Sequence, residues 1–154
     1  MESKKLEIKE FYSSEDKEYW LEQIKKSDWR AGQYLYNQLS QGTLKELCGE
    51  TTRVFLLIDD RSLVSFCILA EVDEVRDTGL TPWIGFVYTF PQYRGRRYVG
   101  RLLDFAQKTA KNDGANQVYI STGEIGLYEK YGYSFYQMMK TKDGADTRVY
   151  TRKL

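Results

Sequence analysis

The sequence of 154 residues contains no histidine, and this absence narrows the chemistry open to the chain. A chain without histidine cannot build a Ser–His or Cys–His catalytic pair, nor a metal site with histidine ligands. Its two cysteines, Cys48 and Cys67, lie far apart and match no metal or redox spacing. We therefore expect two buried free thiols in a reducing compartment, and no metal site.

The chain also lacks an excess of either charge, because 23 lysines and arginines face 22 aspartates and glutamates, for a net charge of +1. A protein held to nucleic acid by its overall field would be more basic, so no nucleic-acid partner is expected. The start of the chain, MESKKLEIKE, lacks the apolar core of a signal peptide, and no apolar run is long enough to span a bilayer. These absences predict a soluble cytoplasmic protein with no membrane partner.

What the chain does contain is an alternation of strand and helix patterns over one domain, residues 1–154. Strands are expected at residues 6–11, in a hairpin over 53–75 with its turn at 59–62, and at 82–90, 117–121, 133–139 and 147–154. Helices are expected at residues 13–26 with Ser13 or Ser14 as cap, over parts of 30–47 with a break near Gly42, from the arginine-rich turn to Gly114, and at 124–131. The strand at 82–90 is apolar on both faces and should be central. The strand–helix–strand order around it predicts a right-handed parallel crossover in an otherwise antiparallel sheet, hence a mixed α/β fold.

The stretch YRGRRYVGRLLDFAQ, residues 93–107, gathers four arginines and two glycines where a predicted helix begins. The unpaired N–H groups and partial positive charge of a helix N-terminus bind anions, so this turn could cradle phosphates. Its spacing matches neither the Walker A motif nor the dinucleotide fingerprint G-x-G-x-x-G. On the turn alone, a phosphate cradle and a solvated arginine-rich first turn are equally good interpretations.

A longer stretch, FPQYRGRRYVGRLLDFA, resembles the acetyl-CoA-binding segment of the GNAT family of N-acetyltransferases, V-x-P-x-x-R-G-x-G-x-G/A followed by a helix with paired leucines. The positions that match are Pro91, Tyr93, Arg94, Gly95, Leu102 and Leu103. A second stretch, STGEIGLYEKYGYSFY, resembles the family signature N-x-x-A-x-x-L-Y-x-x-x-G-F through Leu127, Tyr128, Gly132 and Tyr133. Both motifs stand in the family's order with a strand between them, and the resemblance covers essentially the whole chain.

Some positions depart from the family pattern. Arg97 stands where the family has glycine, Val99 where it has glycine or alanine, and Gly100 comes one place late. Ser121 replaces the common asparagine and Glu124 the common alanine. Because backbone N–H donors survive such changes, we expect cofactor binding to survive, with the side chains of Arg97 and Val99 directed away from the pyrophosphate.

The resemblance implies a mostly antiparallel central sheet with one parallel, splayed strand pair and flanking helices. It implies an N-acetyltransferase that moves the acetyl group of its cosubstrate acetyl-CoA to a primary amine, by direct attack in a ternary complex. The pantetheine arm would lie between the strand ending at Phe90 and the strand 117–121, and the pyrophosphate on the turn 94–100. The cofactor-binding residues would be Val87, Tyr88, Thr89, Arg94, Gly95, Arg96, Arg97, Tyr98, Val99, Gly100 and Ser121.

The resemblance also assigns catalytic roles. The backbone N–H of Thr89 would face the developing oxyanion. Tyr128 would protonate the departing CoA thiolate, which suits a phenol because its ordinary pKa of about 10 is near that of a thiol. Without histidine, the general base would be a carboxylate acting through water, or the amine would arrive already neutral. Glu71 is our candidate base, with Asp73 and Glu124 as alternatives, and together these acids suggest a vestibule for a cationic amine.

The acceptor stays open at this point. A small cationic amine is favoured over a protein amine, and the aromatic residues Trp29, Tyr34 and Tyr36 either face that substrate or belong to the core. The alternative function is a non-catalytic CoA-binding sensor with the same fold. A phosphate- or RNA-binding protein is disfavoured by the near-neutral charge. A homodimer is compatible with the resemblance.

Overall fold

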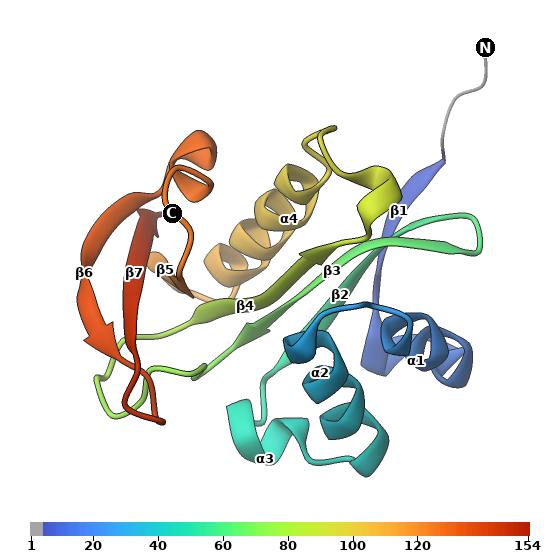
Figure 1. Cartoon of the computed structure of the whole chain (residues 1–154), viewed down its shortest axis with the longest axis horizontal. Coiled ribbons are helices and arrows are strands. Elements are labelled where there is room, and N and C mark those ends of the chain that lie inside the picture. The colour runs from blue at the N-terminus through green and yellow to red at the C-terminus, as the bar shows by residue number, and fades with distance from the viewer. Residues whose placement is uncertain (1–4) are drawn as a thin grey trace.

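The computed structural model describes residues 5–154, so the first four residues of the expected domain lie outside the described part. A seven-stranded sheet forms its centre, in the order β1-β2-β3-β4-β5-β7-β6 (Figure 1). The strands are β1 (Leu6–Glu10), β2 (Arg53–Asp59), β3 (Ser62–Ala70), β4 (Trp83–Thr89), β5 (Gln117–Thr122), β6 (Ser134–Lys140) and β7 (Asp146–Lys153). Neighbouring strands pair antiparallel except for β4 and β5, so the predicted mixed, mostly antiparallel sheet with a central β4 is confirmed.

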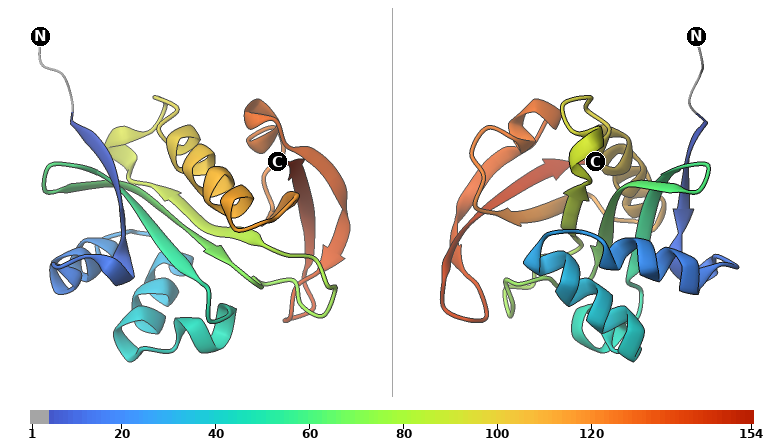
Figure 2. Two further views of the ribbon diagram at one scale, coloured as in Figure 1. Left: turned by 180° about the vertical axis from the view of Figure 1, so that it is seen from behind. Right: turned by 45° about the vertical axis from the view of Figure 1, so that its right-hand side comes forward.

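Helices cover both faces of the sheet. One face carries α1 (Lys17–Lys25), α2 (Arg30–Gln41) and α3 (Leu44–Cys48), and the other carries α4 (Val99–Asn112), as Figure 2 shows from two sides. Three short 3-10 helices are η1 (Phe11–Ser13), η2 (Pro91–Tyr93) and η3 (Tyr128–Tyr131). Within residues 5–154, no helix is both long and apolar enough to cross a membrane.

The two helical layers explain why β2 reads as an uninterrupted apolar run. Alternate side chains of a strand point to opposite faces of the sheet. Val54, Leu56 and Ile58 therefore pack beneath α1, α2 and α3, whereas Phe55 and Leu57 pack beneath α4. A strand with covered faces on both sides needs apolar residues at every position.

Glycines end the two long helices near the places predicted from them. Gly42 follows α2 with a φ of +72°, and Gly114 comes shortly after α4 with a φ of +100°. This left-handed conformation suits glycine, which has no Cβ to clash. The start of α1 differs from the prediction, because Asp16 rather than a serine occupies the N-cap position, and no side chain caps the helix. The predicted helix at 124–131 is also shorter, since only η3 forms there.

The parallel pair of β4 and β5 meets near the start of β4 and then diverges. Its one register pair is Trp83 with Tyr119. Farther along β4, between the paired residues Gly85 and Tyr88, two residues face one residue of β3, which makes a β-bulge. Phe86 in this bulge has a φ of +51°. The sheet is therefore open between β4 and β5 beside an irregular stretch of β4.

Candidate active site

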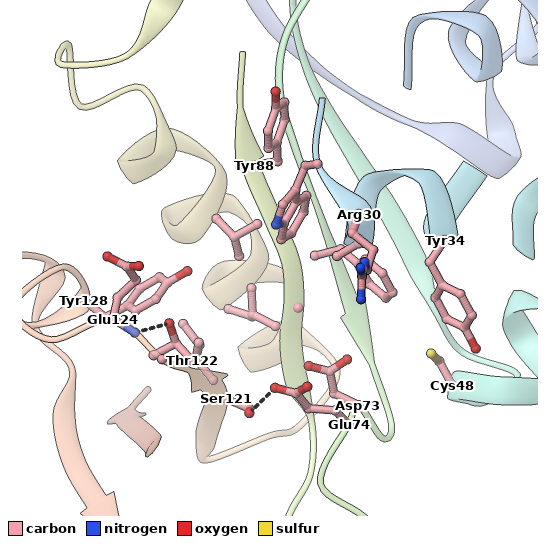
Figure 3. Close-up of a pocket in the computed structure, with 18 of the residues that line it drawn as sticks. Arg30, Tyr34, Cys48, Asp73, Glu74, Tyr88, Ser121, Thr122, Glu124 and Tyr128 are labelled. Carbon is pink, nitrogen blue, oxygen red and sulfur yellow. Dashed lines mark hydrogen bonds between the residues drawn. The ribbon is translucent and has the colours of Figure 1, made fainter. Parts of the chain in front are cut away.

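A cavity of about 1110 Å³ lies where β4 and β5 diverge (Figure 3). Five segments line it: the start of α2, the end of α3, the loop from β3 to β4, most of β4, and the end of β5 with the loop that leads to η3. The tip of the β6–β7 hairpin adds Lys142 and Asp143. The stretches after β4 and β5, which carry the two family motifs, therefore meet here with α2, the β3–β4 loop and the β6–β7 hairpin, which carry no motif.

The backbone of β4 presents an amide to this cavity. The N–H of Phe90 donates to the carbonyl of Val64 on β3 at 3.0 Å. Because antiparallel pairs alternate between hydrogen-bonded and non-hydrogen-bonded, the preceding residue Thr89 directs its N–H and C=O away from β3, toward β5. The Thr89 carbonyl accepts a hydrogen bond from Arg94 Nε at 2.8 Å. The Thr89 amide is therefore not used in pairing with β3, and its oxyanion role stays a prediction.

Tyr88 fastens β4 to the loop that precedes α2. Its hydroxyl donates to Asp28 Oδ1 at 2.7 Å, and the ring of Trp29 stacks on it with centroids 5.3 Å apart. The guanidinium of Arg94 lies 5.3 Å from the centre of the same ring. Tyr88 and Val87 both line the cavity, and the buried Tyr88 ring also holds the start of α2 against the sheet.

The arginine-rich turn before α4 bends sharply, with φ of +81° at Gly95 and +59° at Arg97. Of its arginines, Arg94 lines the cavity. Arg97 extends toward η3, where its guanidinium lies 4.9 Å from the centre of the Tyr131 ring. A Cβ on Gly100 would approach that ring to 2.9 Å, so α4 and η3 pack closely at this point. The Arg97 side chain therefore packs against η3 and does not cover the backbone of the turn.

The other predicted binding residues have different settings. Arg96 is exposed, and Tyr98 and Val99 are half-buried against the core beneath α4. Ser121 lines the cavity, but its hydroxyl donates to Glu74 Oε2 at 2.5 Å (Figure 3). That contact ties β5 to the loop between β3 and β4. At the cavity the structure thus brings together Val87, Tyr88, Thr89, Arg94 and Ser121, while residues 95–100 form the adjoining turn.

Tyr128, the candidate acid, lies in η3 at the wall of the cavity opposite α2 and is only 5% exposed. Figure 3 shows its phenol beside Glu124 and Thr122, at the end of β5. Its ring meets the edge of Tyr133 with centroids 6.1 Å apart. Burial, followed by the Cys67 thiol and the Glu124 carboxylate, raises the pKa of Tyr128 above its ordinary value. The phenol therefore stays protonated at neutral pH, and the same shift makes it a weaker acid than an ordinary tyrosine.

The structure does not bring Glu71 to the cavity, so this candidate base is corrected. Its exposed carboxylate accepts hydrogen bonds from the N–H of Thr51 at 3.0 Å and from the Thr51 hydroxyl at 2.8 Å. These bonds lower the pKa of Glu71, which makes it a weaker base. The cause is a tight turn after β3, where the amides of Glu71 and Val72 both donate to the carbonyl of Cys48. This turn ends the strand alternation on which the prediction depended.

Asp73, named as an alternative, lies at the floor of the cavity instead. Its carboxylate sits over Gly85 of β4, where a Cβ would come within 2.7 Å of Asp73 Oδ2. Burial, reinforced by the carboxylate of Glu74, raises the pKa of Asp73 to about 7. Such a group can take a proton from an amine near neutral pH. The sequence did hold a signal: Gly85 interrupts a bulky strand, and a glycine there often marks a close approach of another group.

Aromatic side chains form the cavity wall on the α2 side. Tyr34 stacks on Phe86 of the bulge with ring centroids 6.3 Å apart, and Trp29 lies beside them. Tyr36 packs against the core instead, with the ammonium of Lys25 over its ring. Two of the three aromatic residues expected near the acceptor therefore line the cavity.

Several cavity residues were not found from the sequence. Arg30, Cys48 and Lys142 lie on α2, α3 and the hairpin tip, and the fold alone brings them to one place. No motif contains them, so only the tertiary arrangement reveals them. Cys48 and Cys67 are both buried and unbridged, as predicted.

The comparison with protein families gives a match over most of the chain. Residues 10–133 match the model of a family described as the acetyltransferase (GNAT) family. The comparison with curated proteins finds no similar sequence.

Solved structures share the fold at low sequence identity. An acetyltransferase from Streptococcus agalactiae 2603 is 19% identical, with a TM-score of 0.66 over 97% of this chain and 98% of that one. A GNAT family acetyltransferase from Elizabethkingia anophelis with acetyl-CoA bound is 18% identical, with a TM-score of 0.66 over 97% and 98%. Aminoglycoside 6'-acetyltransferase type Ii is 15% identical, with a TM-score of 0.68 over 96% of each chain. The likeness is one of fold, and it extends over nearly the whole of each protein.

Proposed function

The chain belongs to the acetyltransferase (GNAT) family, and we propose that it transfers an acetyl group from acetyl-CoA to a primary amine, by direct attack in a ternary complex. One observation carries the proposal. The cavity between β4 and β5 is lined by Tyr128, whose phenol is protonated, by Asp73, whose carboxylate has a raised pKa, and by Thr89, whose amide points away from β3. Acid, base and amide are the three groups that acyl transfer to an amine uses.

The residues present fit acetyl-CoA, which supplies the acetyl thioester. The outward-facing backbone around Thr89 offers an N–H and C=O edge for an extended amide-bearing arm, in the manner of an added strand. The turn 94–100 enters α4, whose N-terminus favours the negative charge of a pyrophosphate. At Gly95 no atom lies within 4 Å of the place where a Cβ would be, so a phosphate can approach the backbone there. Arg94 stands where the turn meets the cavity.

Asp73 receives the amine in this proposal. A primary amine is mostly an ammonium ion near neutral pH and must lose a proton before it can attack. The raised pKa of Asp73, about 7, makes its carboxylate a better proton acceptor than an ordinary aspartate. Asp73 takes that proton, the amine nitrogen forms the new C–N bond, and the Thr89 N–H donates to the oxygen that gains negative charge.

Tyr128 completes the transfer. When the C–S bond breaks, the departing thiolate takes the phenolic proton. The nitrogen, which enters as an ammonium ion, loses two protons in all: the first goes to Asp73 before the attack, and the second leaves the adduct and returns through water to the Tyr128 phenolate. Burial keeps the phenol in its protonated form until that moment. The role is supported by the position of Tyr128 at the cavity and at the matching place of the family signature.

Two measurements test the proposal together. Isothermal titration with acetyl-CoA should give one site per chain, and a CoA-release assay over a panel of primary amines should give amine-dependent turnover. Tight binding of acetyl-CoA without release of CoA for any amine would instead support a sensor with the same fold. No binding at all would contradict both functions.

A further inference from the structure

The cavity is lined by equal numbers of acidic and basic side chains. Its acids are Asp73, Glu74, Glu124 and Asp143, and its bases are Arg30, Arg76, Arg94 and Lys142. A vestibule built for a cationic amine alone would carry an excess of acids. The balance points to an acceptor that brings both charges with it.

Two of these charged groups already form hydrogen bonds within the protein. Glu74 accepts the hydroxyl of Ser121 at 2.5 Å, and Arg76 donates from Nη2 to the carbonyl of Leu47 at 2.8 Å. These bonds hold the loop between β3 and β4 in place. The groups left to meet a ligand include the carboxylate of Asp73 on the floor and the cations Arg30 and Lys142.

Arg30 is the cation best placed to meet an anionic group. It is the first residue of α2, it is exposed, and within residues 5–154 its guanidinium has no hydrogen-bond or ion-pair partner. Figure 3 shows it pointing from α2 into the cavity, on the side where Asp73 lies. The partial positive charge at the start of α2 adds to its attraction for an anion. A guanidinium pairs well with a carboxylate, because two of its N–H groups match the two oxygens.

The net charge decides between anions. Counted as ionised, the four acids and four bases that line the cavity sum to zero, and two of the cations, Arg30 and Lys142, make no side-chain hydrogen bond to the described residues. A ligand with one ammonium and one carboxylate matches this sum. A phosphate carries more negative charge than these two cations could balance beside Asp143.

We infer that the acceptor is an amino-acid-like zwitterion, whose primary amine lies at Asp73 and whose carboxylate lies at Arg30. The inference rests on the proposed acetyl transfer and names the substrate class for it. The stacked rings of Tyr34 and Phe86 line the same cavity and offer a flat apolar wall for the carbon skeleton of the ligand. The structure thus assigns a polar contact to each charged group of the acceptor and an apolar one to its carbon skeleton.

Matched pairs of acceptors test the inference, each an amino acid and the amine left when its carboxylate is removed. Phenylalanine with phenethylamine and lysine with cadaverine are suitable pairs. The parent protein should show kcat/KM at least about tenfold higher for the amino acid, since a hydrogen bond to a charged group is typically worth that much. In Arg30→Gln this preference should disappear, through a loss of about tenfold for the amino acid and less than about twofold for the amine.

Lys108→Gln is the control variant. Lys108 is exposed on α4 and pairs with Asp104, so its replacement removes one positive charge far from the cavity. It should leave the preference unchanged. An equal loss for both members of a pair in Arg30→Gln, or a parent that prefers the decarboxylated amine, would overturn the inference while acetyl transfer stands.

Titration of the amino acids into the protein saturated with CoA separates the two ideas further. Binding that weakens about tenfold in Arg30→Gln, without any acetyl transfer, would uphold the zwitterion site and refute the proposed reaction. Transfer to amines without any advantage for amino acids would do the reverse. Neither binding nor transfer would overturn both.

Discussion

Replacing Asp73 by asparagine should make the folded protein more stable at neutral and alkaline pH. The carboxylate lies over Gly85 and beside Glu74, and this setting raises the pKa of Asp73 from an ordinary 3.8 to about 7. Folding therefore opposes the ionised form. Asparagine keeps the shape of the side chain and carries no charge. The folded variant is therefore not destabilised by an ionised group at position 73.

The sign follows from proton linkage. Between about pH 4 and pH 7, Asp73 is protonated in the folded protein and ionised in the unfolded chain, so the folded state binds more protons and loses stability as the pH rises. The full interval from 3.8 to about 7 corresponds to about 4 kcal/mol, at about 1.4 kcal/mol per pH unit. From about pH 5 to about pH 8, the unfolding free energy of Asp73→Asn should gain about 2–3 kcal/mol on that of the parent.

Urea unfolding of both proteins across this pH range measures the difference between their unfolding free energies. Glu71→Gln is a matched control of opposite sign, because the hydrogen bonds from Thr51 lower the pKa of Glu71. A lowered pKa stabilises the folded state above the unfolded value, so this variant should lose stability relative to the parent as the pH rises through the acidic range. If the difference in unfolding free energy between Asp73→Asn and the parent does not increase with pH, burial does not raise the pKa of Asp73.

The same variant bears on catalysis. If Asp73 is the base, Asp73→Asn should lower kcat/KM for primary amines by about 10²–10⁴-fold, the usual worth of general base assistance. The parent's kcat/KM should also rise with pH through about 7 as Asp73 ionises. The kcat/KM of the variant should not show this rise. A stabilised variant with parent turnover would show that Asp73 is buried for another reason.

Three more changes test other parts of the site. Tyr128→Phe keeps the ring and removes the proton, so turnover should fall about 10²–10⁴-fold with acetyl-CoA affinity nearly unchanged, and the loss should shrink for thioesters with more acidic thiols; parent turnover would contradict the role. Gly85→Ala places a methyl group 2.7 Å from Asp73 Oδ2, so kcat should drop while acetyl-CoA still binds in a titration. Gly95→Pro cannot adopt the φ of +81° and lacks the N–H, so acetyl-CoA binding should be lost while circular dichroism still reports the fold; parent affinity would mean that the turn is not the cradle.

The elements of the fold could be predicted from the sequence because local patterns determine them. The continuous apolar runs of β2 and β3, the apolar stripe of α4 and the glycine after α2 each signal their element within a short window. The order of the elements then leaves few topologies, and the crossover through α4 makes β4 and β5 parallel. The expectation for Thr89 and Tyr128 has a different origin, because the resemblance of two stretches to the family's motifs implied their roles.

The base and the acceptor residues depend on geometry that no short window contains. Glu71 and Asp73 are two residues apart and would share a face on a regular strand, but the turn held by the Cys48 carbonyl breaks that period. Arg30 and Lys142 are far apart in sequence and meet at the cavity only through the packing of α2 and the β6–β7 hairpin. Such residues lie on loops and helix ends, where sequence patterns carry the least information about direction.

Several features that weaken the fold meet at the divergence of β4 and β5. Phe86 holds a left-handed φ, which costs a bulky residue about 1–3 kcal/mol, and Asp73 sits where its charge is disfavoured. The outward backbone groups of Thr89 have no strand beside them, because β5 has already turned away. A sheet selected only for stability would pair β4 with β5 along its whole length and would place an apolar side chain at Gly85. Each departure instead supplies a part of the proposed reaction: a slot for the cosubstrate, an amide that faces it, and a carboxylate that accepts a proton near neutral pH. Such conflict with local rules, concentrated at one place in an otherwise regular sheet, is the physical signature expected of an active site.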